Sequence, residues 1–544
     1  MSLNRRLFLK AGAAMAAIAT VPRQLYAQFD GAPEPLPPIE DPRIATLAAR
    51  ALDSAKSAGA AYADVRLSHT RTRHFFPGST ADEEDMEVGV RALVLGYWGF
   101  ASGPVWSPDE MARLGREAVH QAKTNAIGKP RLVSLAPAPV VQNGNWVMPV
   151  KLDPFEVSPF ETQDQLMSLV FFAQRIPNAF LFRNYATGTM QEKAFASTAG
   201  SYCTQRTYRT EGQLIVQLAL SSKHRPDARV TLDCVSPAGM GWELYAAESI
   251  PRVRKHSLRD ELQMRTEEAR ADAMLPLKAL DVGRFDTVFD ASGIANILDG
   301  TLARATELDR ALGYEANAGG TSYLGDPDAM LGAYQAGASQ LSVTANRSEA
   351  GGAATTKWDD EGVVPDDFTI VKDGLLVDFQ TTRESAGWLK DAYAKKGTPL
   401  RSHGCASAPS AIHAPMQHIP NLSIAPGRES GDFDALVSGM ADGVAIKQAS
   451  VDMDFQAGSG IGFGAGGVFE VKKGKRVARY QSAGFLFRST DFWKSLFSVS
   501  ADAQMQRIGF SAQKGEPAQR CYHSVTAAPA VVKGLTVIDP VRKA

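Results

Sequence analysis

The sequence is poor in the residues and patterns that carry most enzyme chemistry. Its 544 residues include four cysteines and nine histidines. The cysteines are scattered without a Cys-x-x-Cys pair, so they predict no disulfide framework. No histidine belongs to a His-Glu-x-x-His motif. The glycine-rich segment 458–467 lacks the Lys-Ser pair of a phosphate-binding loop and the strand-to-helix turn of a serine hydrolase, and is typical of a β-turn region.

Excess charge of one sign and long apolar runs are absent as well. The 58 basic and 59 acidic residues leave a formal net charge of -1, so the chain has no electrostatic footprint for nucleic acid. No apolar run of membrane-spanning length follows residue 28. Hydrophobic residues make up 44% of the chain, which is enough for sizeable cores, and the length suits two large domains.

The first residues read as an export signal. Arg5 and Arg6 precede "LFLK" and a weakly apolar, alanine-rich stretch, in the order of a basic region and a hydrophobic region. This pattern predicts a twin-arginine-type signal over residues 1–28 and a periplasmic or otherwise exported protein. Cleavage after Ala27 and an uncleaved anchor both remain open. A proline-rich spacer follows over residues 29–42.

Helical and strand patterns alternate in residues 43–275. Segment 42–60 has apolar residues at helical spacing and ends at glycine. Residues 86–102 read as two strands joined by a turn at Gly96, and Ser107 is a candidate N-cap of the helix that follows. These features predict an N-terminal α/β domain.

Short strands and frequent glycines dominate residues 283–544. The Lys-Asp-Gly turn at 372–374 and the Lys-Lys-Gly-Lys turn at 472–475 are typical of β-hairpins. We therefore expect a β-rich C-terminal domain after a boundary near residues 275–286. The whole chain is predicted to belong to the α+β class.

Several segments, taken in order, resemble one known family. "YADVRLS", "TELDRALGYEAN", "PNLSIAPG" and "DFWKSLFSV" are similar to segments of the TldD/PmbA family, metallopeptidase-like proteins once called modulators of DNA gyrase. The resemblance covers nearly the whole chain after the spacer. It implies an N-terminal α/β domain, a β-rich C-terminal domain, and a two-subunit assembly that encloses a chamber. In that assembly one subunit holds zinc and the other does not.

The resemblance also places the zinc-binding positions of the family on this chain. In metal-bearing members a His-Glu-x-x-x-His segment precedes the stretch that matches "TELDRALGYE", and a cysteine supplies a third ligand. The two histidine positions fall on Asp299 and Arg304, the glutamate that acts as general base on Gly300, and the cysteine on Ala512. Zinc requires neutral imidazoles and a nearby proton acceptor, whereas Arg304 carries a permanent positive charge. We therefore expect no zinc and no other cofactor.

Displaced ligands are the alternative. Cys521 and His523 stand two residues apart, which places both side chains on one face of a strand, so they could offer a sulfur and a nitrogen to a metal. His403 and Cys405 have the same spacing. The ordinary interpretation of both pairs is that they are packing and hydrogen-bonding residues of a β-rich domain.

The segment 297–322 reads as a helix that leads into a polar, glycine-bearing loop, like the rim of an active site that lacks reacting groups. Its charged and aromatic residues are candidates for a substrate pocket, namely Glu307, Asp309, Arg310, Tyr314 and Glu315.

Two functional hypotheses follow from the sequence. The first is an exported, non-catalytic subunit that forms a homodimer, or a heterodimer with a zinc-bearing TldD-like paralogue, and takes part in the handling of peptides. The second is an active metallopeptidase that uses displaced ligands. A candidate contact for the dimer is an apolar helical face at i, i+1, i+4 and i+5, formed by Phe492, Trp493, Leu496 and Phe497. The same face could instead pack into its own domain.

Overall fold

The computed structural model describes residues 39, 41–127, 132–218, 228–317 and 319–541. The expected export signal and nearly all of the spacer therefore lie outside the described residues. Within the described ranges, no helix is both long enough and apolar enough to cross a membrane.

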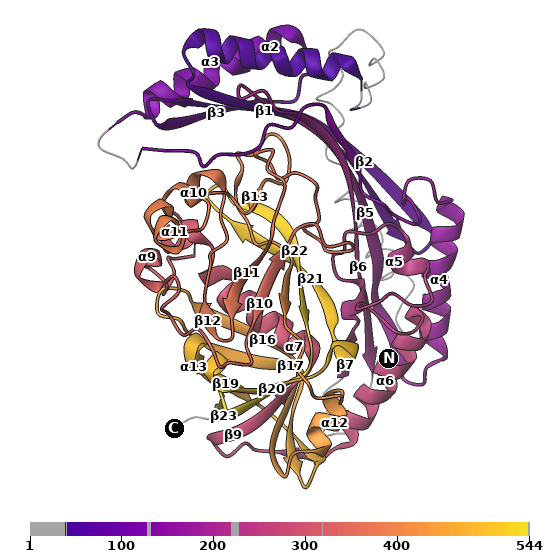
Figure 1. Ribbon diagram of the computed structural model, residues 1–544. Helices are drawn as coiled ribbons and strands as arrows, with labels where there is room; N and C mark the ends of the chain where they lie inside the picture. The colour runs from indigo at the N-terminus through magenta and orange to yellow at the C-terminus, as the bar shows by residue number, and fades with distance from the viewer. Residues whose placement is uncertain (1–38, 40, 128–131, 219–227, 318, 542–544) are drawn as a thin grey trace.

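The N-terminal region is built on one sheet of long strands, in the order β3-β2-β1-β5-β6-β4, with β7 paired to β6. Figure 1 shows this sheet curving around the C-terminal region, with α2 and α3 over one end and α4 and α6 along the other. The strands are β1 (Tyr62–Phe76), β2 (Ser79–Val94), β3 (Tyr97–Gly103), β4 (Gly144–Val147), β5 (Ala179–Ser197), β6 (Tyr202–Leu218) and β7 (Ala228–Thr231). The helices are α2 (Pro42–Ala58), α3 (Pro108–Asn125), α4 (Pro159–Arg175), α5 (Glu243–Ala246) and α6 (Leu258–Met274).

Local signals in the sequence begin and end these helices. The Asp41 side chain accepts a hydrogen bond from the backbone N–H of Arg43 at the start of α2, which ends at Gly59 with a left-handed φ of 106°. Ser107 caps α3 by accepting from the N–H of Glu110. The predicted helix 42–60, the N-cap at Ser107 and the strand pair around Gly96 are confirmed.

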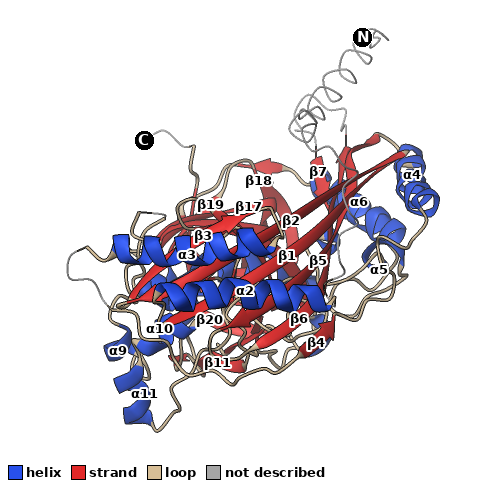
Figure 2. Ribbon diagram, turned by 90° about the horizontal axis from the view of Figure 1, so that it is seen from above, coloured by secondary structure: helices blue, strands red, loops and turns tan. Residues whose placement is uncertain are grey.

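Strand β1 is covered on both faces. Val65 and Leu67 belong to the core beneath α2 and α3, which lie across the strands in Figure 2. The alternate residues Asp64, Arg66 and Ser68 are buried as well, because the C-terminal region covers the other face of the sheet. A strand that alternates apolar and polar residues is therefore buried along both sides here.

The C-terminal region contains two larger sheets around one large core. The first has the order β12-β11-β10-β15-β22-β21, and the second β16-β9-β23-β19-β17-β18-β8, with β20 paired to β23. Helix α7 (Ala291–Leu298) contacts β16, β21 and β22, so it lies between the two sheets. The strands are β8 (Leu277–Lys278), β9 (Gly283–Phe289), β10 (Val343–Asn346), β11 (Asp367–Lys372), β12 (Leu375–Leu376), β13 (Ala406–Ser407), β14 (Met416–Gln417), β15 (Leu422–Ile424), β16 (Asp442–Asp454), β17 (Ser459–Lys472), β18 (Lys475–Tyr480), β19 (Gly484–Arg488), β20 (Leu496–Val499), β21 (Gln506–Lys514), β22 (Gln519–Ala527) and β23 (Ala530–Ile538).

The remaining helices of this region are short: α8 (Leu308–Ala311), α9 (Pro327–Met330), α10 (Arg383–Gly387), α11 (Lys390–Lys396), α12 (Phe433–Ser438) and α13 (Ser489–Lys494). The two predicted hairpin turns are confirmed, since β11 pairs with β12 and β17 with β18. In both turns an Asp or Lys and the following Gly have positive φ, as a two-residue hairpin loop requires. The α+β class predicted from the sequence is confirmed.

The prediction of one apolar helical face at residues 492–497 is wrong. Helix α13 ends at Lys494, and Leu496 already belongs to β20, which pairs with β23. Phe492, Trp493 and Leu496 are buried in the core of their own region, whereas Phe497 is 52% exposed and the Lys533 ammonium lies 3.5 Å from its ring centroid. Three of the four residues therefore pack within the chain and do not form an apolar surface.

Candidate functional site

The segment between α7 and α8 contains a widened helical turn. Residues Asp299–Ala303 form a π-helix, in which hydrogen bonds run from i to i+5. Residues five apart in an α-helix point in different directions, but here an oxygen of Asp299 lies 3.7 Å from a guanidinium nitrogen of Arg304. The widened turn therefore brings these two side chains together as an ion pair.

His523 of β22 meets this turn from the sheet. Its Nε2 lies 2.8 Å from Oδ1 of Asp299, and the ring of Phe510 stacks beside it at 5.5 Å between centroids. Burial alone would raise the pKa of Asp299, but the hydrogen bond from His523 and the charges of His523 and Arg304 hold that pKa below its usual value. Asp299 is thus an ionised carboxylate that accepts a hydrogen bond from His523 and forms an ion pair with Arg304.

A buried lysine occupies the end of β21. The Nζ of Lys514 lies 2.9 Å from Oε1 of Glu307 and 2.7 Å from Oδ1 of Asp309. Glu307 also pairs with Arg310 at 3.2 Å, so charges of both signs alternate through this cluster. Burial, together with the neighbouring Glu307, raises the pKa of Asp309 to about 6 even though Lys514 opposes the shift. Glu315 accepts a hydrogen bond from the backbone N–H of Gly515 at 3.2 Å.

The charged residues of segment 306–317 that were candidates for a substrate pocket therefore have their partners inside the protein. Glu307, Asp309 and Arg310 bind one another or Lys514, and Glu315 holds the turn after β21. Tyr314 differs from them, because it is 50% exposed and donates a hydrogen bond to Oε1 of Glu384 at 3.1 Å.

A neutral histidine lies near this cluster. His418 is buried, and no hydrogen-bond partner for its Nε2 is found among the described residues. Burial, with a smaller contribution from the charge of Lys514, lowers the pKa of His418 to about 3. Its imidazole is consequently uncharged at neutral pH.

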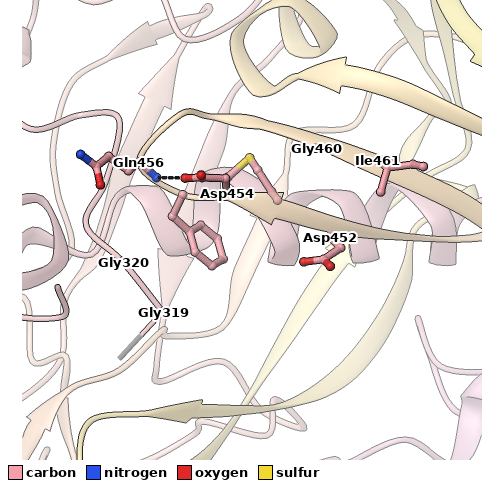
Figure 3. A pocket seen from close by; sticks show the side chains of 9 residues that line it. Gly319, Gly320, Asp452, Asp454, Gln456, Gly460 and Ile461 are labelled. Atoms are coloured by element: carbon pink, nitrogen blue, oxygen red, sulfur yellow. Dashed lines mark hydrogen bonds between the residues drawn. The ribbon is translucent and has the colours of Figure 1, made fainter. Parts of the chain in front are cut away.

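An open hollow of about 610 Å³ adjoins the loop that follows Tyr314. Figure 3 shows Gly319 and Gly320 on one side and Asp452 and Asp454 of β16 on the other. Asp454 accepts from the backbone N–H of Gln456, so its carboxylate caps a turn. Asp454 is therefore engaged in this cap. Asp452 is the other carboxylate that faces the hollow.

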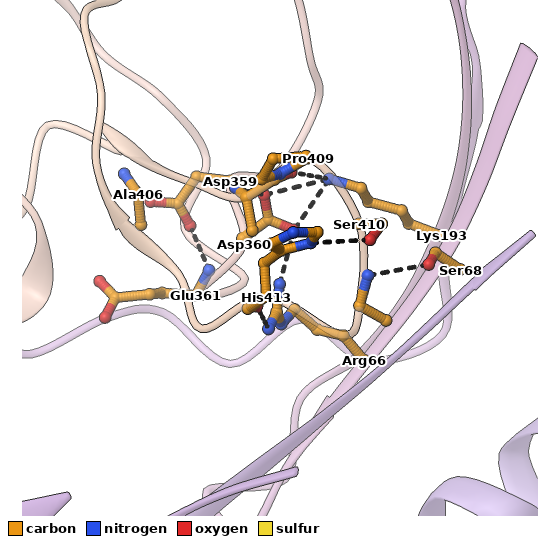
Figure 4. Close-up of polar contacts among 12 residues, drawn as sticks. Arg66, Ser68, Lys193, Asp359, Asp360, Glu361, Ala406, Pro409, Ser410 and His413 are labelled. Atoms are coloured by element: carbon orange, nitrogen blue, oxygen red, sulfur yellow. Dashed lines mark hydrogen bonds and ion pairs between the residues drawn. The ribbon is translucent and has the colours of Figure 1, made fainter. Parts of the chain in front are cut away.

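A polar cluster that the sequence did not reveal joins the two regions. Asp359, Asp360 and Glu361 follow Trp358 in one turn, and Figure 4 shows Lys193 and Arg66 of the N-terminal sheet reaching toward them. The Nζ of Lys193 lies 3.0 Å from Asp360. Burial raises the pKa of Asp359 to about 7, whereas Lys193 and Arg66 hold the pKa of Asp360 low despite its burial.

This cluster could have been suspected from β1, because polar residues alternate there with core residues. The carboxylate of Asp359 stabilises its own turn, because it accepts hydrogen bonds from the N–H groups of Glu361 and Val363. Asp360 instead binds across the two regions. The two adjacent carboxylates therefore differ in their contacts: Asp359 stabilises the turn, and Asp360 joins the two regions.

Comparison with known proteins identifies the framework around these residues. Residues 282–539 match the family model of the PmbA/TldA metallopeptidase C-terminal domain. The chain belongs to the TldD/PmbA family. The metalloprotease MJ0996 of Methanocaldococcus jannaschii is 21% identical over 469 residues, which span 84% of this chain and 93% of that protein.

Solved structures agree on the fold. TldE from Thermococcus kodakarensis superposes with a TM-score of 0.64 at 14% identity, covering 91% of this chain and 99% of that chain. A candidate modulator of DNA gyrase from Thermotoga maritima gives a TM-score of 0.63 at 16% identity, covering 91% of this chain and 100% of that one. At these identities the similarity concerns the fold alone.

The side chains at and beside the positions where the family resemblance leads us to expect zinc ligands do not fit a zinc ion. Arg304 and Lys514 each carry a positive charge, which would repel a zinc ion. Both charges are already paired with carboxylates. Gly300 leaves no space for the glutamate of metal-bearing members, because a Cβ placed there lies 2.4 Å from Cγ2 of Val451. Within the described residues, no group of three or more His, Cys, Asp or Glu side chains is arranged to hold a metal.

The side chains that the sequence offered as displaced zinc ligands each have other partners in the structure. Cys521 pairs with Ala512 across the β21–β22 hairpin, and its thiol interacts with Ser407. Burial raises the pKa of the Cys521 thiol to about 11, which disfavours the thiolate that metals bind. His523 is directed to Asp299. His403 binds Asp366 and Asp378, and so has two carboxylate partners of its own.

Proposed function

We propose that this chain is a non-catalytic subunit that assembles with a zinc-bearing relative acting on peptides. The observation that carries the proposal is the ion pair of Asp299 and Arg304, closed by His523, at the two histidine positions of the zinc motif. The guanidinium of Arg304 would repel a metal cation bound at this position, and its charge is already balanced by the Asp299 carboxylate.

The neighbouring charges support the same proposal. Lys514 and Arg310 provide the positive charges that pair with Glu307 and Asp309, so these two carboxylates have counter-charges from the chain itself. Hydrolysis by a zinc peptidase needs a Lewis acid and a general base, and Gly300 offers no proton acceptor. A chain with this framework is suited to shape a shared peptide-binding space while its relative supplies the chemistry.

The proposal is tested first by metal content. Protein purified without chelators is expected to hold far less than one zinc per chain by elemental analysis. One tightly bound zinc per chain that disappears in Cys521→Ser or His523→Gln would replace the proposal with an active enzyme that uses displaced ligands.

Assembly and activity form the second test. We expect co-expression with a relative that carries an intact His-Glu-x-x-x-His segment to yield a mixed complex that cleaves unstructured peptides. Cleavage should be lost when the relative's histidines are replaced and should persist with Asp299→Asn in this chain. A protein that stays monomeric by light scattering in the presence of that relative would contradict the partner role.

Export through the twin-arginine route is a separate proposal, supported by Arg5 and Arg6 before the apolar stretch. The double variant Arg5→Lys with Arg6→Lys keeps the charge and changes only the guanidinium groups. We expect it to accumulate in the cytoplasm. An unchanged periplasmic yield after fractionation would indicate another route.

A further inference from the structure

A buried histidine of the C-terminal region lies between two carboxylates. The Nδ1 of His403 is 2.9 Å from Oδ2 of Asp366, which precedes β11, and its Nε2 is 3.2 Å from Oδ2 of Asp378, which follows β12. The residue is 4% exposed, and its ring stacks on Phe368 with 3.9 Å between the centroids. The imidazole therefore joins the loop 398–405 to both ends of the β11–β12 hairpin.

Both contacts together require a protonated ring. An ionised carboxylate only accepts hydrogen bonds, so both ring nitrogens must donate, whereas a neutral imidazole has a single N–H. Burial alone would lower the pKa of His403, but the hydrogen bonds to Asp366 and Asp378 and the charges of these carboxylates raise it above its usual value. A ring that loses its proton turns a nitrogen lone pair toward one carboxylate and loses that hydrogen bond.

Each carboxylate has one further side-chain partner. The Nε of Arg401 lies 3.0 Å from Oδ2 of Asp366, and the hydroxyl of Tyr393 in α11 donates to Oδ1 of Asp378 at 2.7 Å. In the described part of the chain the imidazolium is thus the cation that bonds to Asp378, whereas Asp366 would keep Arg401. The loss of the proton is therefore felt most at Asp378.

The other titratable side chains near these carboxylates behave differently. Burial raises the pKa of the Cys405 thiol to about 12, and burial with the charge of Asp378 raises the pKa of Tyr393, so both groups stay neutral at moderately alkaline pH. Lys396 of α11 donates to the carbonyl of Val377 at 3.2 Å, and burial lowers its pKa despite the charge of Asp378. This exposed lysine therefore needs a control of its own.

The loop that carries His403 also holds the chain after Asp378. The N–H of His403 donates to Oγ1 of Thr381 at 3.0 Å, and the N–H of Cys405 donates to the carbonyl of Thr381 at 3.1 Å. Between them, Gly404 has a φ of 72°, and a Cβ placed there lies 2.7 Å from Cα of Pro365. The loop is thus pressed against the hairpin, and it positions segment 378–382.

This segment continues into α10, which contacts the N-terminal region. The Nε of Arg383 donates to the carbonyl of Ala136 at 3.0 Å, and its Nη1 donates to the hydroxyl of Tyr62 at 3.2 Å. Glu384 accepts from the indole N–H of Trp98 at 2.9 Å. In Figure 1, α10 lies at the end of the C-terminal region that faces β1 and β3. The contacts of His403 therefore lie directly behind a junction of the two regions.

We propose that His403 is a proton-dependent clamp, which fastens the β11–β12 hairpin and the junction at α10 while its ring is protonated and loosens them when the proton is lost. In the loosened segment the imidazole has its usual pKa of about 6.5, whereas in the clamp the pKa is raised. The clamped state binds the proton more tightly. Its contribution is therefore complete below about pH 6.5 and is lost as pH rises through the raised pKa.

The protonation state of the ring is tested first. Nuclear magnetic resonance of the full chain with isotope-labelled imidazole nitrogens distinguishes an imidazolium, with two N–H groups, from a neutral ring with one, and His403→Gln assigns the signal. We expect an imidazolium at pH 7 that becomes neutral as pH rises. A neutral His403 ring at pH 7 would overturn the clamp.

Amide hydrogen exchange of the full chain measures the loosening. Mass spectrometry follows segment 378–396, and protection factors correct for the intrinsic effect of pH on exchange. Between pH 7 and pH 9.5 we expect protection of this segment to fall by about fivefold or more, because each pKa unit corresponds to a factor of about ten. Protection of α3, measured in the same sample, should stay within about twofold.

Four variants assign the effect to the imidazole. His403→Gln cannot carry the charge and should show low protection at both pH values, whereas the matched control His120→Gln alters an exposed histidine of α3 and should behave like the parent. Asp378→Asn should move the fall in protection to lower pH, because one of the two stabilising charges is gone. Lys396→Met should leave the fall in place. If His403→Gln does not fold, the shift in Asp378→Asn decides.

Protection of segment 378–396 that does not change with pH, or that changes equally in His403→Gln, would overturn the proposal. A fall that disappears in Lys396→Met, or that is equally large in α3, would do the same, because it would belong to the lysine or to the whole protein. These measurements involve neither zinc nor a partner, so their failure is distinct from failure of the partner role.

Discussion

Replacing Lys514 with methionine should destabilise the protein strongly at neutral pH. Lys514 is 4% exposed, and among the described residues it is the cation that pairs with Asp309, whereas Glu307 would keep Arg310 at 3.2 Å. The variant leaves the largely buried carboxylate of Asp309 without its counter-charge. Breaking a buried pair in this way costs about 3–5 kcal/mol, and we expect a loss of that size in the free energy of unfolding, measured with urea at pH 7.

The same variant should be less harmful at pH 5. The pKa of Asp309 is already about 6, and loss of Lys514 raises it further. The folded state then binds a proton that the unfolded state, with an aspartate pKa of about 3.9, releases. Stability of the variant therefore increases as pH falls from 7 toward 5, and the difference from the parent protein shrinks.

Two controls sharpen this prediction. Lys390→Met removes an exposed lysine on α11 and should change the free energy of unfolding by less than about 0.5 kcal/mol. Adding Asp309→Asn to Lys514→Met should recover part of the loss, because the unpaired charge is gone. A loss below about 1 kcal/mol for Lys514→Met that does not depend on pH would refute the reasoning.

Three more outcomes are expected. Gly300→Ala should lower the free energy of unfolding by about 1–2 kcal/mol, because its Cβ meets Val451 at 2.4 Å, and Val451→Ala should relieve that loss in the double variant by urea denaturation. Asp299 has a lowered pKa, so its contribution to stability is present above about pH 4 and is lost as pH falls. The difference in the free energy of unfolding between Asp299→Asn and the parent, measured at pH 7 and pH 3, should therefore shrink at the lower pH. Arg91→Met should cost about 3 kcal/mol by thermal or chemical unfolding, since two buried carboxylates lose their partner, and a second change, Glu361→Gln, should reduce that cost.

Features that depend on neighbouring residues could be predicted from the sequence. The N-cap at Ser107, the glycine end of α2 and the hairpin turns around Gly374 and Gly474 are confirmed. Each involves groups within a few residues, so local hydrogen bonding and backbone geometry determine them.

Residues 492–497 show where such reasoning ends. Their spacing fits a helix, but the chain leaves α13 at Ser495 so that Leu496 can pair with Val532 in β23. This pairing and the burial of Trp493 depend on a strand more than thirty residues further along the chain. Spacing within one segment contains no information about that strand.

The sequence by itself determined the family resemblance and the identities of the side chains at positions 299, 300, 304 and 512. Only the tertiary structure decided what those side chains do. The π-helical turn joins Asp299 to Arg304, the β21–β22 hairpin brings His523 to the same carboxylate, and Lys514 meets Glu307 across more than two hundred residues. These contacts come from the packing of α7 against two sheets, and a buried charge is stable only where folding supplies its partner.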